Sequence, residues 1–265
     1  MNHEPGRDNS QVSNAQRPTV RYLIISDIHA NLDAFEAVLA HAEGRWDRAL
    51  VLGDLVGYGA EPGAVIDRVR ALDPDVVIRG NHDKAACGID DGSQFNTVAR
   101  IAAIWTGDRL APEKLDYLRA LPMGPVEIDS LTEICHGAPF DEDHYIFDGN
   151  DARMAFEAAE RPLCLYGHTH LPAIFRMFDD HFEGALPDPD REVVVPLQRG
   201  VHYLINAGSI GQPRDGDPRA GYGILDADAR ELRLYRVPYP VEEAQRKIIA
   251  AGLPVSLANR LALGR

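Results

Sequence analysis

The sequence has few cysteines and no long apolar run. Its 265 residues contain three cysteines, Cys87, Cys135 and Cys164, at wide spacing and with no C-x-x-C pair. This pattern excludes a disulfide-stapled scaffold and predicts reduced thiols in a cytoplasmic protein. No stretch approaches the roughly 18 apolar residues that a membrane span needs, so we expect no membrane partner.

Positive charge is also scarce. The 27 lysines and arginines are outnumbered by 41 aspartates and glutamates, which gives a formal net charge of −14. Long nucleic acids bind proteins mainly through cationic side chains that neutralise their phosphates. A chain of this charge is therefore not expected to bind long nucleic acid.

The beginning of the chain lacks the apolar segment of a signal peptide. Residues 1–18 are polar and rich in Asn, Gln and Ser, and we expect them to form a disordered polar tail. No Ser- or Gly-rich linker divides the remainder, so residues 19–265 are predicted to form a single domain, with two smaller domains as the alternative. A chain of this length buries enough apolar surface to fold without a structural metal, so any bound metal is expected to be functional.

Short apolar runs that end in polar loops recur along the chain. Strands are predicted at residues 20–25, 49–52, 76–78, 131–135, 163–166 and 203–205, and a hairpin at 222–225 and 232–237. Helical spacing of apolar residues predicts helices at 31–42, 61–72, 95–105 and 241–251. Residues 179–192, with two prolines and six acids, are expected to form a loop. The repeated order of strand, polar loop and helix predicts a layered α/β domain.

Side chains that bind divalent cations follow these apolar runs. Five of the ten histidines stand there with three other polar residues, the whole set being Asp27, His29, Asp54, Asn81, His82, His136, His168 and His170. Each one alone is more readily explained as a structural histidine or a turn residue. Together they offer only carboxylate, imidazole and carboxamide groups, which are the donors that two divalent cations need. Along an extended backbone, the side chains of Asp27 and His29 would point the same way, and so would those of His168 and His170.

These residues stand in five ordered motifs, which are Asp27-x-His29, Gly53-Asp54-x-x-Gly57, Gly80-Asn81-His82-Asp83, His136-Gly137 and Gly167-His168-x-His170. In this order they resemble the motifs of the calcineurin-like metallophosphoesterase superfamily. Residues 206–222 resemble a later segment of its bacterial phosphodiesterase and phosphatase branch. The resemblance implies an α/β fold in four layers, an α/β/β/α sandwich of two mixed β-sheets flanked by helices.

The resemblance also implies a site for two divalent cations. One ion would be held by Asp27, His29, Asp54 and His170, and the other by Asp54, Asn81, His136 and His168, so that Asp54 bridges. Two such ions polarise a phosphoryl group and lower the pKa of a shared water, so the nucleophile would be a metal-bridging hydroxide. Manganese is expected because the family often works with it, and Fe, Co, Ni or Zn would suit the same oxygen and imidazole donors.

His82 and Asp83 are the predicted catalytic residues. In the family, the histidine of this motif donates to the phosphate or protonates the leaving group, and Asp83 is suited to orient it. General acid catalysis of this kind contributes about 10²–10⁴-fold to a rate. The structural alternative is that His82 only supports its loop.

Three further residues are candidates for substrate binding, namely Arg214, Asn31 and Ser209. A guanidinium binds phosphate through paired hydrogen bonds, although Arg214 would alternatively form an ion pair with Asp215 or Asp217. The position of Asn31 before a predicted helix also suits a helix cap.

The sequence departs from the protein serine/threonine phosphatases of the superfamily. These carry a phosphate-binding arginine in a GDxVDRG pattern, whereas residues 53–59 here read GDLVGYG. The missing arginine favours small phosphodiesters, phosphomonoesters or dinucleoside polyphosphates as substrates. Phosphoprotein phosphatase activity and a non-catalytic scaffold of the same fold are the alternatives. His82 favours an enzyme, because the non-catalytic relative departs at that motif.

Overall fold

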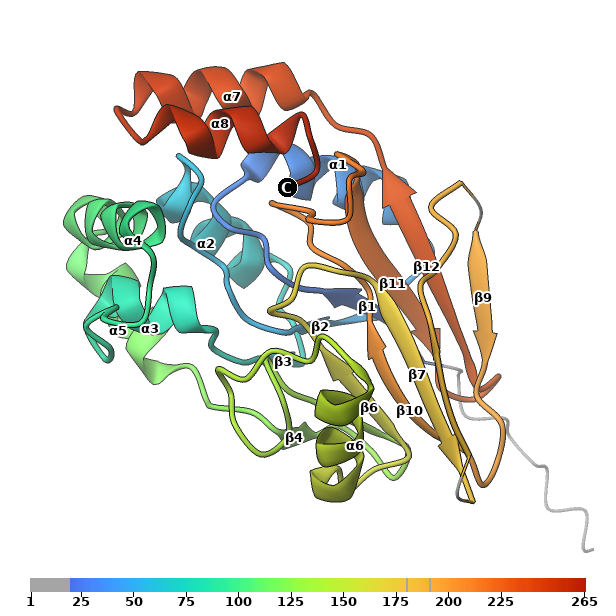
Figure 1. Ribbon diagram of the computed structural model, residues 1–265. Coiled ribbons are helices and arrows are strands. Elements are labelled where there is room, and N and C mark those ends of the chain that lie inside the picture. Colours follow the sequence, from blue (N-terminus) through green and yellow to red (C-terminus); the bar gives the residue numbers. More distant parts are fainter. Residues whose placement is uncertain (1–19, 180, 191) are drawn as a thin grey trace, which may run out of the picture.

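The computed structural model describes residues 20–265 apart from residues 180 and 191. The predicted polar tail at residues 1–18 lies outside the described residues, so the division into a tail and one domain stays a prediction. The described residues form two six-stranded sheets (Figure 1). In spatial order, the first contains β3 (Val76–Val77), β2 (Arg48–Val51), β1 (Arg21–Ile25), β11 (Ala220–Asp226), β12 (Glu231–Val237) and β9 (Val193–Pro196). The second contains β4 (Val126–Glu127), β5 (Thr132–Ile134), β6 (Leu163–Tyr166), β10 (His202–Asn206), β7 (Ala173–Phe178) and β8 (His181–Ala185).

Both sheets are mixed, and each contains three neighbouring parallel strands. In the first sheet β1, β2 and β3 run parallel, and β11 pairs antiparallel with β1. In the second sheet β5, β6 and β10 run parallel, and β7 pairs antiparallel with β10. The loop after β6 meets the loop after β1, because the His168 amide donates to the Asp27 carboxylate. The carboxyl ends of the two parallel sets therefore lie close together, which is where α/β sheets commonly carry their sites.

Helices cover the outer faces of both sheets. They are α1 (Leu32–Ala42), α2 (Pro62–Ala71), α3 (Asn81–Cys87), α4 (Thr97–Arg109), α5 (Pro112–Ala120), α6 (Gly149–Ala158), α7 (Val241–Ala250) and α8 (Val255–Leu261). Buried side chains of α6 pack against the second sheet, and those of the other helices share one core with the first sheet. A third core lies between the sheets. These layers confirm the predicted four-layer α/β/β/α sandwich (Figure 1).

The layers follow from the alternation of side chains along each strand. In β1, Leu23 and Ile25 belong to the core under the helices. Tyr22 and Ile24, between them, belong to the core between the sheets. A strand that is apolar on both faces is thus buried from both sides, as the short continuous apolar run predicts.

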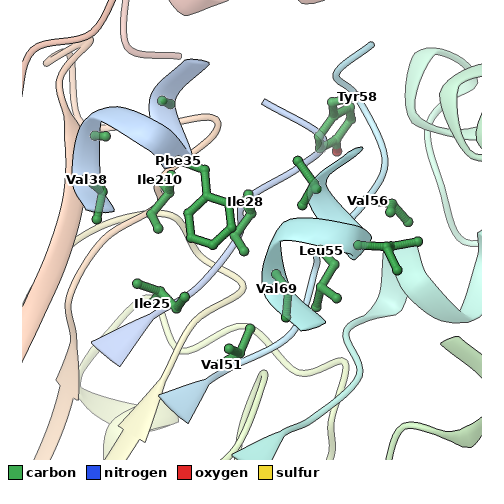
Figure 2. Close-up of a cluster of buried hydrophobic side chains, with 14 of the residues drawn as sticks. Ile25, Ile28, Phe35, Val38, Val51, Leu55, Val56, Tyr58, Val69 and Ile210 are labelled. Carbon is green, nitrogen blue, oxygen red and sulfur yellow. The ribbon is translucent and has the colours of Figure 1, made fainter. Parts of the chain in front are cut away.

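Apolar side chains anchor the loops that follow β1 and β2. Ile28 stands between Asp27 and His29 in the sequence and is fully buried, and Leu55 directly after Asp54 is buried as well. Figure 2 shows Ile28 and Leu55 in one cluster with side chains of the strands and helices around them. Because these apolar residues are held in the core, the polar residues beside them are fixed in position.

The predicted strands and helices are present, with shifted ends, except in the segment 179–192. There His181–Ala185 forms β8, which pairs antiparallel with β7. The prediction of a loop is therefore wrong for these residues. β8 is an edge strand with mostly exposed side chains, so main-chain hydrogen bonds hold it and no alternating apolar pattern marks it.

All three cysteines are free and buried, as predicted. The cytoplasmic location inferred from these thiols stays a prediction. Within residues 20–265, setting aside the two undescribed positions, no helix has the length and apolar character needed to cross a bilayer.

Candidate metal centre

The predicted site residues come together at the carboxyl ends of the parallel strands. Asp27 and His29 follow β1, Asp54 follows β2, His136 follows β5, and His168 and His170 follow β6, while Asn81 and His82 open α3 after β3. All of them are buried apart from Asn81, which is half-buried. Segments far apart in the sequence thus deliver one cluster of polar groups into the interior.

The backbone of this cluster is not extended. Asp27, His29, Asp54, His168 and His170 have φ angles of 53°, 51°, 52°, 64° and 60°. The expectation that residues i and i+2 point together along an extended chain is therefore wrong, and tight left-handed turns bring the side chains together instead. Non-glycine residues in this region cost about 1–3 kcal/mol each and tend to gather at functional sites.

One group of ligand atoms comprises Asp27, His29, Asp54 and His170, whose donor atoms all lie within 4.8 Å of one another. His170 Nε2 is 3.3 Å from Asp27 Oδ1, and His29 Nε2 is 3.5 Å from Asp54 Oδ2. This is the set predicted for the first cation, and its mixed oxygen and imidazole donors suit a divalent transition ion.

The tautomers of two histidines in this group test whether a cation fits. The Nδ1 atoms of His29 and His170 lie 3.1 and 2.6 Å from the carbonyl oxygens of Val56 and Gln212. A carbonyl oxygen only accepts, so each Nδ1 carries the hydrogen. In the neutral rings both Nε2 atoms then present lone pairs, and these atoms are 3.0 Å apart. Lone pairs this close repel each other unless a cation or proton lies between them, so the pair fits a metal ion.

The second group comprises Asp54, His136 and His168. The ring of His136 donates from Nδ1 to the Leu52 carbonyl oxygen at 2.8 Å, and its Nε2 lies 3.5 Å from Asp54 Oδ2. His136 Nε2 is also 3.4 Å from Asn81 Oδ1, which brings the fourth predicted ligand to the same place. These contacts fit a second cation beside the first.

Asp54 belongs to both groups. Its Oδ1 accepts a hydrogen bond from the His82 amide at 2.8 Å. Its Oδ2 is buried without a hydrogen-bond partner in the described chain and lies 3.5 Å from Nε2 of both His29 and His136. A buried carboxylate oxygen is costly without a partner, so Oδ2 is suited to be shared by two cations. A Cβ at Gly80 would lie 2.2 Å from Asp54 Oδ1, which explains the glycine there.

Electrostatics hold this cluster in a charged state. Burial opposes ionisation of Asp54, yet attraction to the charged imidazole of His136 holds the pKa of its carboxyl well below the usual range. Burial likewise lowers the pKa of His136, but the nearby Asp54 carboxylate outweighs it and raises that pKa to about 10. Burial lowers the pKa of His168 to about 3. Since metal ligands must be deprotonated, a cation would take the place of the His136 proton.

His82 lies beside the cluster, enclosed by aromatic rings. Its ring centroid is 4.2 Å from that of Tyr58 and 4.5 Å from that of Phe95. Nδ1 has no hydrogen-bond partner among the described residues, and burial lowers the pKa of the ring to about 4. The imidazole is therefore neutral, and its Nδ1 faces Gly57, where an added Cβ would lie 2.5 Å from that atom.

Asp83 connects two loops of the site. Its oxygens accept hydrogen bonds from the amides of Val56 and Gly80, at 3.1 and 3.0 Å. The carboxylate is thus engaged with the backbone and not with the His82 ring, so any orienting effect on His82 is indirect. Its catalytic role stays a prediction.

Asn31 and Ser209 make structural contacts. Asn31 caps α1 by accepting from the Ala34 amide at 3.1 Å, and it donates to the Gly211 carbonyl oxygen at 3.0 Å. Ser209 donates from Oγ to the main-chain oxygen of Asp27 at 2.9 Å. Both side chains are buried, and their predicted contacts with substrate stay predictions.

Arg214 faces the site without a carboxylate partner in the described chain. Asp215 pairs with Arg236, and Asp217 pairs with Arg219, so neither forms the ion pair that was the alternative for Arg214. The Arg214 Nη2 atom instead donates to Gln212 Oε1 at 3.2 Å and to the Tyr58 hydroxyl at 3.4 Å. Its guanidinium is therefore available for an anion.

Lys84 is a residue of the site that the sequence motifs did not reveal. It is buried, and its ammonium group donates to the carboxylates of Glu142 and Asp143 at 3.0 and 2.6 Å. The main-chain oxygen of Asp143 accepts from His168 Nε2 at 3.0 Å, which leaves Nδ1 of that ring for a metal. Lys84 thus joins α3 to the loop that orients His168. A lysine is usually exposed, so only the three-dimensional contacts reveal this role.

Replacing Lys84 by methionine is expected to lower the free energy of unfolding by about 2 kcal/mol. This is less than for a fully buried pair, because Asp143 reaches solvent. Glu142 keeps its pair with Arg79, but Asp143 loses its cation, which should release the loop and weaken metal binding. Urea denaturation and metal titration measure the two effects. Lys114→Met, which breaks an ion pair with Asp67, is the control and should leave metal affinity unchanged; equal metal affinity in both variants would contradict the role of Lys84.

Several known proteins are similar to this chain in sequence and fold. Residues 20–230 match the profile of the calcineurin-like phosphoesterase superfamily domain. The crystal structure of a metallophosphoesterase from Sphaerobacter thermophilus is 42% identical, with a TM-score of 0.82, and the match covers 93% of this chain and 100% of that one. An uncharacterised protein of Methanocaldococcus jannaschii is 35% identical over 247 residues, or 91% of this chain and 97% of the relative. Phosphodiesterase YfcE of Escherichia coli is 26% identical over 79% of this chain and 89% of its own length.

The fold and the buried cluster of carboxylates and imidazoles are those of a metal-dependent phosphoric ester hydrolase. The chain belongs to the calcineurin-like phosphoesterase superfamily. Its similarity to YfcE and to the Sphaerobacter thermophilus enzyme confirms the bacterial branch predicted from the motifs.

Proposed function

We propose that the chain hydrolyses small phosphodiesters with two divalent cations. One ion would be held by Asp27, His29, Asp54 and His170, and the other by Asp54, Asn81, His136 and His168. The observation that carries this proposal is the position of Asp54 Oδ2, which is buried, unpartnered among the described residues and equidistant from His29 and His136.

The side chains of the site bind and orient the substrate. When bound, the two cations polarise the phosphoryl group and lower the pKa of a water molecule. His82 donates a hydrogen bond from Nε2 to a phosphoryl oxygen or to the leaving oxygen, since its ring lies beside the cluster, with its centroid 5.0 Å from that of the ligand His29. Arg214, which has no Asp or Glu partner among the described residues, binds a phosphate oxygen of the substrate. The aromatic rings around His82 keep water from it.

The substrate class rests on two observations. The segment 53–59 lacks the arginine of the phosphoprotein phosphatases, and the E. coli relative is named a phosphodiesterase. Phosphomonoesters and dinucleoside polyphosphates are the other small substrates that suit the site. We propose Mn²⁺ as the working ion because the family often works with it, while the oxygen and imidazole donors also suit Fe, Co, Ni or Zn.

The protein stripped of metal by a chelator is expected to be inactive and to regain activity with Mn²⁺. The assay compares bis-p-nitrophenyl phosphate, p-nitrophenyl phosphate, diadenosine tetraphosphate and a phosphoserine peptide, each with Mn²⁺, Mg²⁺, Ni²⁺ and Zn²⁺. We expect turnover of the diester and little of the peptide. Faster hydrolysis of the peptide would overturn the substrate class, and two bound ions without any turnover would identify a scaffold.

A further inference from the structure

Two arginines from distant parts of the chain meet at one aromatic ring. Arg214 lies in the loop after β10, and Arg260 belongs to α8. The guanidinium carbon of each is 5.9 Å from the centroid of the Tyr58 ring. The ring of Tyr58 is in turn 4.2 Å from that of His82 and 4.7 Å from that of His29. The guanidinium groups of Arg214 and Arg260 thus lie beside the proposed reaction centre.

These two guanidiniums lack the Asp or Glu partners that a half-buried arginine normally has. Among the described residues, neither Arg214 nor Arg260 forms an ion pair with an Asp or Glu side chain, and Arg214 Nε is buried without a hydrogen-bond partner. Nε of Arg260 donates to the terminal oxygen of Arg265, while no described residue accepts from its two Nη atoms. Burial lowers the pKa of Arg260, and repulsion from Arg214 adds to this. Two like charges held together in this way are stabilised by an anion.

The position of Arg260 is fixed by the end of the chain. The Gly216 amide donates to the Gly264 carbonyl oxygen at 2.9 Å. A Cβ on Gly264 would lie 2.5 Å from the Asp217 amide nitrogen, so the contact is close enough to require glycine. Figure 1 shows the chain end, marked C, beside the orange loop that follows β10. α8 lies outside the segment 20–230 that the family profile matches.

We propose that Arg214 and Arg260 form a second anion subsite, which binds a phosphate of the substrate next to the one that is hydrolysed. This rests on the proposed function and narrows its substrate to compounds with adjacent phosphates, such as nucleoside polyphosphates. Water then supplies the oxygen that bonds to the attacked phosphorus, the bridging P–O bond breaks, and a proton passes to solvent. The departing phosphate keeps the electron pair of that bond, and the two guanidiniums stabilise its charge.

The variant Arg260→Gln tests the subsite through substrate discrimination. With diadenosine tetraphosphate we expect kcat/KM to fall about 10- to 100-fold, because a hydrogen bond between charged groups is lost. With bis-p-nitrophenyl phosphate, which has one phosphorus, we expect little change. Arg246→Gln is the matched control, since it removes the same charge from the neighbouring exposed helix α7. The kcat/KM of Arg260→Lys with diadenosine tetraphosphate should lie between those of the wild type and Arg260→Gln, because lysine keeps the positive charge but lacks the paired donors of the guanidinium.

A binding measurement separates this proposal from the proposed function. Calorimetry on the Mn²⁺-loaded protein should show that inorganic pyrophosphate binds more tightly than phosphate, and that Arg260→Gln removes the difference. This result does not need turnover, so an inactive wild type would refute the proposed function alone. Equal pyrophosphate binding by wild type and Arg260→Gln would overturn the subsite. So would an equal loss with both substrates together with a lower melting temperature, since Arg260 would then only hold the chain end.

Discussion

Replacing Asp54 by asparagine is expected to lower kcat at least about 10³-fold, because cations supply several kcal/mol of transition-state stabilisation. The variant keeps an oxygen that accepts from the His82 amide, so the fold should persist. It loses the negative charge that both groups of ligands share through Oδ2. Steady-state kinetics with bis-p-nitrophenyl phosphate and elemental analysis of the same samples measure the effect.

Loss of the Asp54 carboxylate should weaken metal binding at both positions. Asp75→Asn, which removes an ion pair with Arg48 at the surface, is the control and should keep two ions and full activity. A variant of Asp54 that still binds two ions tightly would show that the carboxylate does not bridge. Circular dichroism of the metal-free forms separates this outcome from unfolding.

Replacing His82 by alanine is expected to lower kcat about 10²–10⁴-fold, as removal of a positioned proton donor does. Both metal ions should stay, because the contact of His82 with Asp54 is made by the main-chain amide, which alanine keeps. We therefore expect a variant with two bound metal ions and a low kcat. It is measured by elemental analysis and kinetics on one preparation.

Two further variants test whether the effect on kcat is specific to the His82 ring. His41→Ala changes a histidine that is bonded to Tyr222, outside the site, and should leave kcat unchanged. His82→Gln keeps a donor of similar length and should recover part of the rate. Full turnover of His82→Ala with two ions bound would show that the ring only supports its loop.

Much of the fold could be predicted, because its strongest signals are local. Tyr22, Leu23, Ile24 and Ile25 are apolar on both faces of a strand, and a short β-branched run predicts that burial. The polar residues after each strand could be placed in loops for the same reason. Their number and chemistry then indicated a metal centre before any geometry was known.

The remainder depends on contacts between distant segments. The left-handed turns at Asp27 and His168 arise where the loops after β1 and β6 join, and no local pattern marks them. β8 is held to β7 by main-chain hydrogen bonds. It therefore needs no alternating apolar side chains, and none mark it in the sequence. Lys84 and Arg260 stand in sequence contexts that are typical of exposed helix surfaces, and only folding brings them to the site.

The most direct test of the account is a crystal of the Mn²⁺-loaded protein measured at the manganese absorption edge. We expect two anomalous peaks, roughly 3.5–4 Å apart, on either side of Asp54 Oδ2. One peak should contact His29 and His170, and the other His136 and His168. A single peak, or peaks that do not contact Asp54, in a preparation with full activity would contradict it.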